Sequence, residues 1–292
     1  MNQLDDKFRG LFWGLVVGDC LGAPVQFTPK DAHVQVTGML PCAFFNTPPG
    51  YWTDDSSLAF CIAESYVRCQ GYDLADVGRN FVRWHDQGFW SSLPYAFDIG
   101  ETTSLAIRGI RDHGRLVNGG ESSQGNGSIM RLAPAFILNY GCEDNRILFA
   151  ISDLTHNSAF VRKVVSQLSG ILCSHCQGVR TSQRSVYSSR AEVNNSGWVY
   201  STVQAALWAF ENSRDFATGM LAAVNLGGDA DSIAAVYGQI AGAYYGYEAI
   251  PRHWLNEIKD HEVIEQLIED FLSLWRTLNP SGAAGRAGGV CQ

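Results

Sequence analysis

Apolar side chains recur at helical spacing along most of the chain, and no stretch alternates apolar and polar residues over the length of a strand. This spacing is typical of amphipathic and buried helices. It predicts helices over residues 7–23, 56–69, 73–87, 104–112, 143–153, 158–177, 198–211, 215–224, 233–247 and 262–278. We therefore expect an all-α fold. It would be one compact domain over residues 1–279, an orthogonal bundle of many helices, followed by a flexible Gly- and Ala-rich tail over 280–292.

The first predicted helix carries a glycine at every fourth position, at Gly10, Gly14, Gly18 and Gly22. A stripe of residues without side chains lets another backbone approach closely, so we expect this helix to be central in the fold. Asp19 lies in the same, otherwise apolar, helix. Because a buried carboxylate must be paired or hydrogen-bonded, Asp19 is either a site residue or a cap for a neighbouring loop.

Two short acidic clusters stand immediately before apolar helical runs. The first is Thr53, Asp54 and Asp55, and the second is Asp229, Asp231 and Ser232. Either cluster alone could be a helix N-cap, because such side chains satisfy the free amides of a first turn. If the clusters meet in space, however, their four carboxylates would repel one another unless a divalent cation neutralised them. Oxygen ligands without His or Cys favour Mg²⁺ or Mn²⁺ over Ca²⁺ and disfavour Zn²⁺.

Several segments without helical spacing are candidates for functional loops. The Gly-, Ser- and Asn-rich residues 119–128 run directly into an expected apolar helix at Ile129, and a glycine-rich loop at a helix N-terminus favours binding of an anion such as a diphosphate over a flexible linker. Residues 25–52 contain four prolines and predict a long ordered loop over the site. Residues 178–197 are polar and are a candidate mobile insertion. Asp98 could cap the next helix or act as a third isolated carboxylate, and a single His in a turn, such as His156, is usually structural.

The composition narrows the class of protein. The net charge of −8 argues against a general nucleic-acid binder or a membrane-surface binder. The N-terminus lacks the pattern of a signal peptide and no apolar run approaches the length of a membrane span, so we expect a cytoplasmic protein. Cys173 and Cys176 have the spacing of a zinc or redox pair, but no second pair accompanies them and buried thiols are the better interpretation.

The order of these motifs resembles the ADP-ribosylglycohydrolase family from Gly10 to Gly246. The matching stretches are GLVVGDCLGAPVQF, YWTDDSSLAF, FDIGETTSLAI, GNGSIMRLAPAF, LTHNS and VNLGGDADSIAAVYGQIAGAYYG. The resemblance implies a single all-α domain around a central binuclear site for two Mg²⁺ or Mn²⁺ ions. It also implies a hydrolase that removes ADP-ribose from a modified side chain or from a small ADP-ribose conjugate.

The resemblance also implies roles for individual residues. The metal ligands would be Thr53, Asp54, Asp55, Asp229, Asp231 and Ser232, where Ser232 replaces the usual Thr and keeps its hydroxyl. Contacts to ADP-ribose would come from Asp19, Gln26, Ser123, Gln124, Gly125, Asn126, Gly127, Ser128, Met130, Arg131 and His156. Asp98 and Asp55 would be the catalytic carboxylates. Gln26 stands where many relatives have Glu, which makes Asp98 the preferred acid or base.

The chemistry expected of such a site is cleavage of a C1″ glycosidic bond through an oxocarbenium-like transition state. Asp98 would act as a base toward water or assist the leaving group. We expect the acceptor to be arginine, because a strongly basic guanidine can depart protonated with little acid help. Two alternatives remain: a protein that binds ADP-ribose without hydrolysing it, and an immunity protein that masks an ADP-ribosyltransferase or its target.

Overall fold

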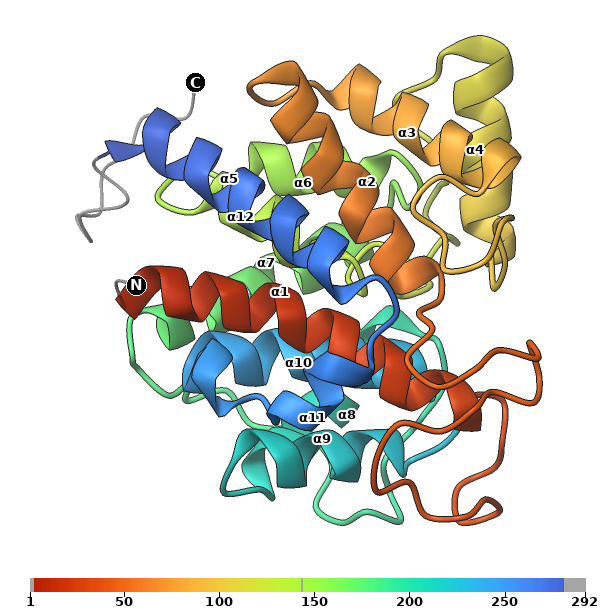
Figure 1. The fold of residues 1–292 in the computed structure, drawn as a ribbon, viewed down its shortest axis with the longest axis vertical. Coiled ribbons are helices and arrows are strands. Elements are labelled where there is room, and N and C mark those ends of the chain that lie inside the picture. The colour runs from red at the N-terminus through yellow and green to blue at the C-terminus, as the bar shows by residue number, and fades with distance from the viewer. Residues whose placement is uncertain (1–2, 143, 281–292) are drawn as a thin grey trace.

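The computed structural model describes residues 3–142 and 144–280, and within them it is helical, with only isolated β-bridges. The central helices are α1 (Gln3–Gly22), α2 (Asp54–Cys69), α5 (Leu132–Asn139) and α10 (Ala230–Tyr245). Around them lie α3 (Leu74–Gln87), α4 (Glu101–His113), α6 (Arg146–Asp153), α7 (Ala159–Cys176), α8 (Val199–Glu211), α9 (Phe216–Val224), α11 (Arg252–Glu257) and α12 (His261–Leu278). Two short 3₁₀ helices, η1 (Ala23–Val25) and η2 (Tyr247–Ala249), follow α1 and α10. The predicted all-α fold is confirmed, and Figure 1 shows it as one compact body.

Helix α1 crosses the middle of the molecule, with α2, α3 and α4 on one side and α8 and α9 on the other (Figure 1). Its glycine stripe packs directly on α10. A Cβ atom built on Gly14 would lie 2.1 Å from the carbonyl oxygen of Gly238, and one on Gly18 would lie 2.2 Å from that of Ala234. The two backbones therefore touch, as the glycine spacing predicts, and Asp19 is carried to the N-terminal end of α10.

The length of α1 requires one correction. Residues Gln3–Val25 are long and apolar enough to cross a membrane, so the expectation that no apolar run approaches that length was wrong. The most apolar part of this segment is 89% buried inside the protein. Phe8 on α1 packs edge-on against Trp275 of α12 with the ring centroids 5.0 Å apart, and Phe12 stacks on Phe60 of α2. Helix α1 is therefore placed as the core helix of this fold.

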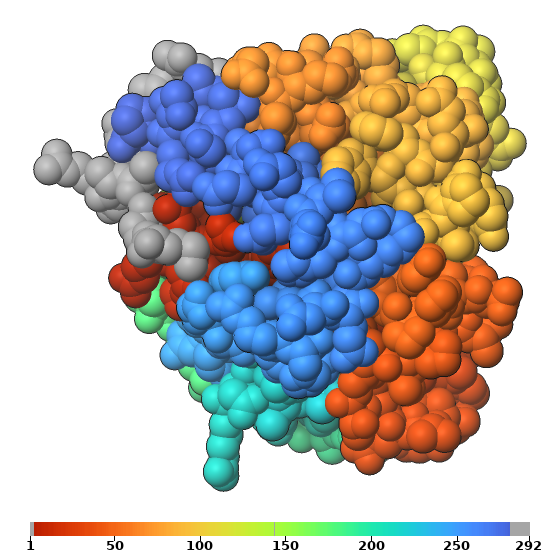
Figure 2. Space-filling view, viewed as in Figure 1, coloured from red at the N-terminus to blue at the C-terminus, as the bar shows by residue number. Residues whose placement is uncertain are grey.

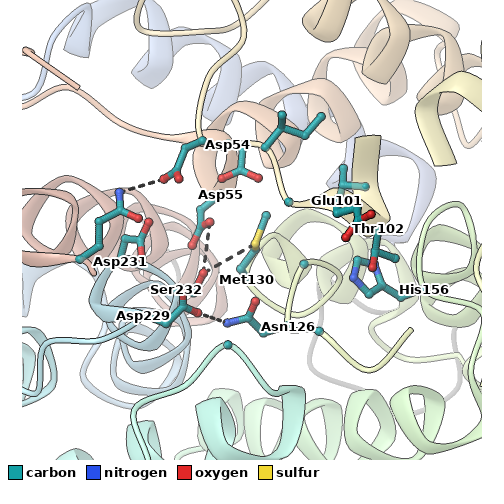
Figure 3. Close-up of a pocket in the computed structure, with 18 of the residues that line it drawn as sticks. Asp54, Asp55, Glu101, Thr102, Asn126, Met130, His156, Asp229, Asp231 and Ser232 are labelled. Carbon is teal, nitrogen blue, oxygen red and sulfur yellow. Dashed lines mark hydrogen bonds between the residues drawn. The ribbon is translucent and has the colours of Figure 1, made fainter. Parts of the chain in front are cut away.

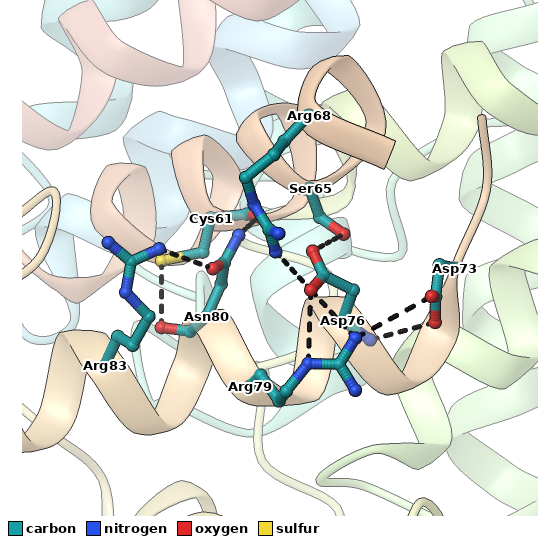
Figure 4. Close-up of polar contacts among 8 residues, drawn as sticks. All are labelled: Cys61, Ser65, Arg68, Asp73, Asp76, Arg79, Asn80 and Arg83. Atoms are coloured by element: carbon teal, nitrogen blue, oxygen red, sulfur yellow. Dashed lines mark hydrogen bonds and ion pairs between the residues drawn. The ribbon is translucent and has the colours of Figure 1, made fainter. Parts of the chain in front are cut away.

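A polar network joins α2 to α3 and fixes the helix that carries the first acidic cluster (Figure 4). Asp76 on α3 is buried and accepts hydrogen bonds from Ser65 Oγ at 2.7 Å, from Arg79 Nη2 at 2.9 Å and from Arg68. Asn80 Nδ2 donates to the Cys61 carbonyl of α2 at 3.0 Å. Because the buried Asp76 and Asn80 side chains of α3 find hydrogen-bond partners on α2, the network ties the two helices together.

Three sequence expectations differ from the structure or fall outside it. Helix α11 carries too short an apolar pattern to be recognised and was not predicted. Residues 178–197 have no regular secondary structure, but Lys30 Nζ donates to the carbonyls of Arg190 and Val193 at 2.8 Å, so this stretch is tied to the loop 25–52. The predicted tail 280–292 lies, except for Pro280, outside the described residues.

Candidate active site

The two acidic clusters lie at neighbouring helix ends. Asp54 and Asp55 begin α2, whereas Asp231 and Ser232 lie in the first turn of α10, just after Asp229. Figure 3 shows these side chains gathered around a common cavity. Ser232 Oγ donates to Asp55 Oδ1 at 3.4 Å, which links one cluster to the other. The predicted meeting of the clusters is therefore present in the fold.

Neither cluster acts as a helix cap. Asp19 of α1 caps α2 instead: its Oδ1 accepts from the Thr53 N–H at 3.0 Å and its Oδ2 accepts from the Ser56 N–H at 3.0 Å. No side-chain cap bond forms at Asp229, the residue before α10. The carboxylates of Asp54 and Asp55 are consequently left free to face the cavity, and the capping alternative for the two clusters is excluded.

The cavity has a volume of about 400 Å³. Its wall contains the carboxylates of both clusters together with Asp98 and Gln26 from two loops. The opposite wall contains the glycine-rich loop and His156. The lining residues are Gln26, Phe27, Asp54, Asp55, Asp98, Ile99, Gly100, Glu101, Thr102, Thr103, Gly125, Asn126, Gly127, Met130, His156, Gly197, Asp229, Asp231 and Ser232.

The electrostatics of the cavity favour a cation. Burial raises the pKa of Asp54, Asp55 and Asp231 well above the usual carboxylate range, and the charges of neighbouring carboxylates raise these pKa values further. Burial likewise raises the pKa of Asp98 to about 7, although hydrogen bonds with Gln26 and Asp231 act in the opposite direction. Such a group of acids is stable in its ionised form only beside positive charge.

The donor atoms also fit a hard divalent cation. Asp55 Oδ2 and Asp231 Oδ1 are buried without a hydrogen-bond partner, one on each cluster. Buried oxygens of this kind are costly unless a ligand satisfies them, and carboxylate and hydroxyl oxygens are the ligands that Mg²⁺ and Mn²⁺ prefer. Within residues 3–142 and 144–280, no three His, Cys, Asp or Glu side chains are placed closely enough to hold an ion as they stand.

The glycine-rich loop is built into the same site. Asn126 Nδ2 donates to Asp229 Oδ2 and, at 3.0 Å, to Thr202 Oγ1, while the Asn126 N–H donates to the Gly197 carbonyl at 3.0 Å. His156 packs against this loop: a Cβ on Gly127 would lie 2.7 Å from its ring carbon Cε1. The loop is therefore an ordered wall and not a linker, and it requires a residue without a side chain at Gly127.

His156 contributes a neutral ring to this wall. Burial, followed by the positive charge of Arg131, lowers the pKa of His156 to about 3, so the imidazole is uncharged at neutral pH. The Nδ1 atom pairs with Thr155 Oγ1 at 2.7 Å. The His156 side chain thus forms part of the cavity wall as a neutral, hydrogen-bonding ring and carries no positive charge.

Several predicted contact residues stand behind the cavity wall. Asp19 is fully buried, its oxygens are occupied by the start of α2, and it does not line the cavity, so it positions the acidic cluster from behind; its contact with ADP-ribose stays a prediction. Arg131 is also fully buried and donates to the Gly127 carbonyl and to Thr155 Oγ1, which places it behind the loop that it supports. Thr53 donates its hydroxyl to Asp19 Oδ1 at 2.9 Å.

The ends of the glycine-rich segment also stand back from the cavity. Ser123 Oγ accepts from the Gly120 N–H, and Gln124 pairs with Trp198 Nε1. Ser128 is buried with an unpartnered hydroxyl. Gly125, Asn126 and Gly127 are thus the part of the predicted loop that faces the cavity.

Sequence reasoning missed one wall of the cavity. Thr102 and Thr103 line it from the first turn of α4, and Phe27 and Gly197 line it from the two long loops. The polar residues before α4 were the available signal of this wall. They are not used to cap the helix, because the N-cap residue is Gly100 and no side chain, including that of Asp98, makes a capping hydrogen bond there. The approach of Gly197, by contrast, depends on chain folding that no local pattern reveals.

The all-α fold and the cavity, in which two acidic helix ends face a glycine-rich loop, define a helical protein with an acidic ligand-binding cleft. The chain belongs to the ADP-ribosylglycohydrolase family, which it matches over residues 1–166 and 158–281. The resemblance stated from the motifs is thereby confirmed, and the protein is a hydrolase that acts on a glycosidic bond of ADP-ribose.

Characterised relatives and a solved structure agree with this family. The ADP-ribosylarginine hydrolase Tri1 of Serratia proteamaculans is 35% identical, over 90% of this chain and 78% of that protein. The ADP-ribosyl-[dinitrogen reductase] glycohydrolase of Rhodospirillum rubrum is 29% identical, over 93% of this chain and 97% of that protein. A solved structure titled ADP-ribosylglycohydrolase-related protein complex superposes with a TM-score of 0.82 at 33% identity, covering 94% of this chain and 100% of that one.

Proposed function

We propose that this protein removes ADP-ribose from arginine side chains of modified proteins and so reverses their ADP-ribosylation. The observation that carries the proposal is the joining of the two acidic clusters beside the glycine-rich loop in one cavity. The acceptor is assigned from two relatives named ADP-ribosylarginine hydrolase, which are 35% and 33% identical to this chain. Because the whole donor set is retained, a protein that only binds ADP-ribose is the weaker alternative.

Two Mg²⁺ or Mn²⁺ ions complete the proposed site. Their ligands would be Thr53, Asp54, Asp55, Asp229, Asp231 and Ser232, of which Asp55 and Asp231 carry the unpartnered oxygens. When bound, the ions would supply a Lewis acid that orients the ribose hydroxyls and makes water a better nucleophile near neutral pH.

The protein's own groups would orient the substrate and move the proton. The backbone amides of Gly125 and Gly127 would bind the diphosphate, and the neutral ring of His156 would close that side. Gln26 Nε2 donates to Asp98 Oδ2 at 2.9 Å and holds this carboxyl at the cavity wall. Asp98 would accept the proton that the attacking water loses and pass it to the departing nitrogen as the C1″–N bond breaks, so that the guanidine leaves as guanidinium.

The proposal is tested by comparing substrates that differ in the amino acid to which ADP-ribose is attached. Release of free ADP-ribose should be measured, in Mg²⁺, from one protein modified on arginine and from one modified on serine. We expect release from the arginine conjugate, and Asp98→Asn should lower kcat by about 10²- to 10⁴-fold, the usual contribution of a general base. Release from the serine conjugate alone would overturn the acceptor assignment. An Asp98→Asn variant with normal turnover would overturn the role of Asp98.

A further inference from the structure

Four phenylalanines gather beside the mouth of the cavity and stay accessible to solvent. Phe27 is 56% exposed and Phe44 is 68% exposed. The ring centroids of Phe27 and Phe44 are 4.9 Å apart, those of Phe44 and Phe45 are 4.8 Å apart, and those of Phe45 and Phe97 are 5.0 Å apart. We call these four residues the phenylalanine rim. Figure 2 shows the loop 25–52, which carries three of them, as an orange-red lobe on the molecular surface.

The backbone holds the rim in place. Phe27 has φ = +61°, a conformation that is costly for a bulky residue. Its N–H donates to the Gly228 carbonyl at 2.6 Å, and the Gly228 N–H donates to the Thr28 carbonyl at 2.7 Å. Phe44 and Phe45 stand on a turn closed by reciprocal bonds between Cys42 and Thr47 at 2.9 and 3.0 Å. Exposed aromatic rings on a fixed and partly strained backbone indicate a recognition surface.

The rim continues from one end of the active site. Phe27 lines the cavity next to Gln26, and Phe97 directly precedes Asp98. The glycine-rich loop meets His156 at the other end, and Figure 3 shows His156 on the opposite side of the cavity from Asp231. With the diphosphate at the glycine-rich loop, the acceptor of the ADP-ribose emerges at the Gln26 end. The rim is then the first protein surface beyond the bond that is cut.

We infer that the phenylalanine rim is a docking surface for apolar side chains of the protein that carries the ADP-ribosylated residue. This inference rests on the proposed function and adds that the preferred substrate is a modified protein and not a free ADP-ribosylated guanidine compound. Phe44 and Phe45 lie outside the cavity lining, so they can contact the acceptor protein without contacting ADP-ribose. Aromatic side chains are enriched in such interfaces because they bury a large area with little loss of conformational entropy.

The test compares two substrates with Phe44→Ser. One substrate is a protein ADP-ribosylated on arginine, and the other is ADP-ribosylagmatine, which has the same bond and no protein around it. Truncating an aromatic residue that anchors an interface costs about tenfold or more in binding. We therefore expect the KM for the protein substrate to rise about tenfold with kcat unchanged, because binding is lost equally in the ground and transition states. The kinetics on ADP-ribosylagmatine should stay within about twofold of wild type.

A matched control is Val263→Ser on α12, where the valine is 56% exposed and is not a rim residue. It should leave both substrates unaffected. An equal effect of Phe44→Ser on both substrates, or no effect on either, would overturn the docking surface. If light scattering shows that the wild-type protein is a dimer and that Phe44→Ser dissociates it, the rim contacts a second copy of the chain and the docking surface for the substrate protein is overturned. If the wild-type protein hydrolyses neither substrate, the proposed function itself fails before any variant is compared, and the docking surface falls with it.

Discussion

Replacing Gly14 by alanine should force apart the two central helices of this fold. The added Cβ would lie 2.1 Å from the Gly238 carbonyl oxygen, whereas ordinary contacts begin at 3.4 Å. The seam between α1 and α10 must therefore open by roughly 1.3 Å, because the atom in the way belongs to the backbone and cannot rotate aside. Overpacking of a core costs about 1–3 kcal/mol and occasionally more, and this rigid contact places the loss near 3 kcal/mol. For a chain of 292 residues that corresponds to a fall in Tm of about 5 °C.

The matched control is Gly170→Ala on α7, where an added Cβ meets nothing within 4 Å. Alanine at such a helical site is expected to be neutral or to stabilise by about 0.4–1 kcal/mol. Urea unfolding followed by circular dichroism and thermal melts should be recorded for both variants. Equal unfolding midpoints for Gly14→Ala and Gly170→Ala would refute the close packing of α1 on α10.

Three further outcomes follow from buried contacts. Burial raises the pKa of Asp76, but hydrogen bonds from neighbouring hydroxyl and guanidinium groups outweigh it and leave the pKa lowered. Asp76→Asn should thus cost about 1–3 kcal/mol at pH 7, and the gap to wild type in urea midpoints should narrow progressively once the pH falls below about 4, toward the lowered pKa of Asp76; a gap as wide at pH 3 as at pH 7 would contradict this. In Gly127→Ala the new Cβ would meet His156 at 2.7 Å, so calorimetry should show weaker ADP-ribose binding than in the unobstructed control Gly120→Ala, and equal affinities would argue against that wall. Asp19→Asn replaces one carboxylate oxygen with an NH₂ group, which cannot accept the hydrogen bonds that the N–H groups of Thr53 and Ser56 donate. The substitution should lower both Tm and the rate of ADP-ribose release; an unchanged Tm would contradict the positioning role of Asp19.

Local pattern was sufficient for most of the fold. The helices follow from apolar spacing, and the central place of α1 follows from glycines at every fourth residue, which Gly14 and Gly18 confirm by contact with α10. The meeting of the two acidic clusters was predictable as well, because four carboxylates without basic partners need a shared cation. These features depend on residue types that are adjacent or periodic in the sequence.

The remaining features depend on contacts between distant segments. Asp19 was recognised as a buried carboxylate, but only the packing of α1 on the start of α2 shows that it caps that helix. The approach of Gly197 to Asn126 joins two loops across the site. The exposure of Phe44 likewise depends on how the loop 25–52 turns at Cys42 and Thr47. No sequence period encodes these placements.

The central claim is that the joined acidic clusters form a metal-dependent site for hydrolysis of ADP-ribosyl-arginine. Its most direct test is release of free ADP-ribose from an arginine-modified protein, measured in Mg²⁺ and then after addition of a chelator. We predict release that stops with the chelator, returns when Mg²⁺ or Mn²⁺ is restored, and is absent in a variant that combines Asp55→Asn with Asp231→Asn. Release that continues at the same rate in the chelator, or in that double variant, would contradict the claim.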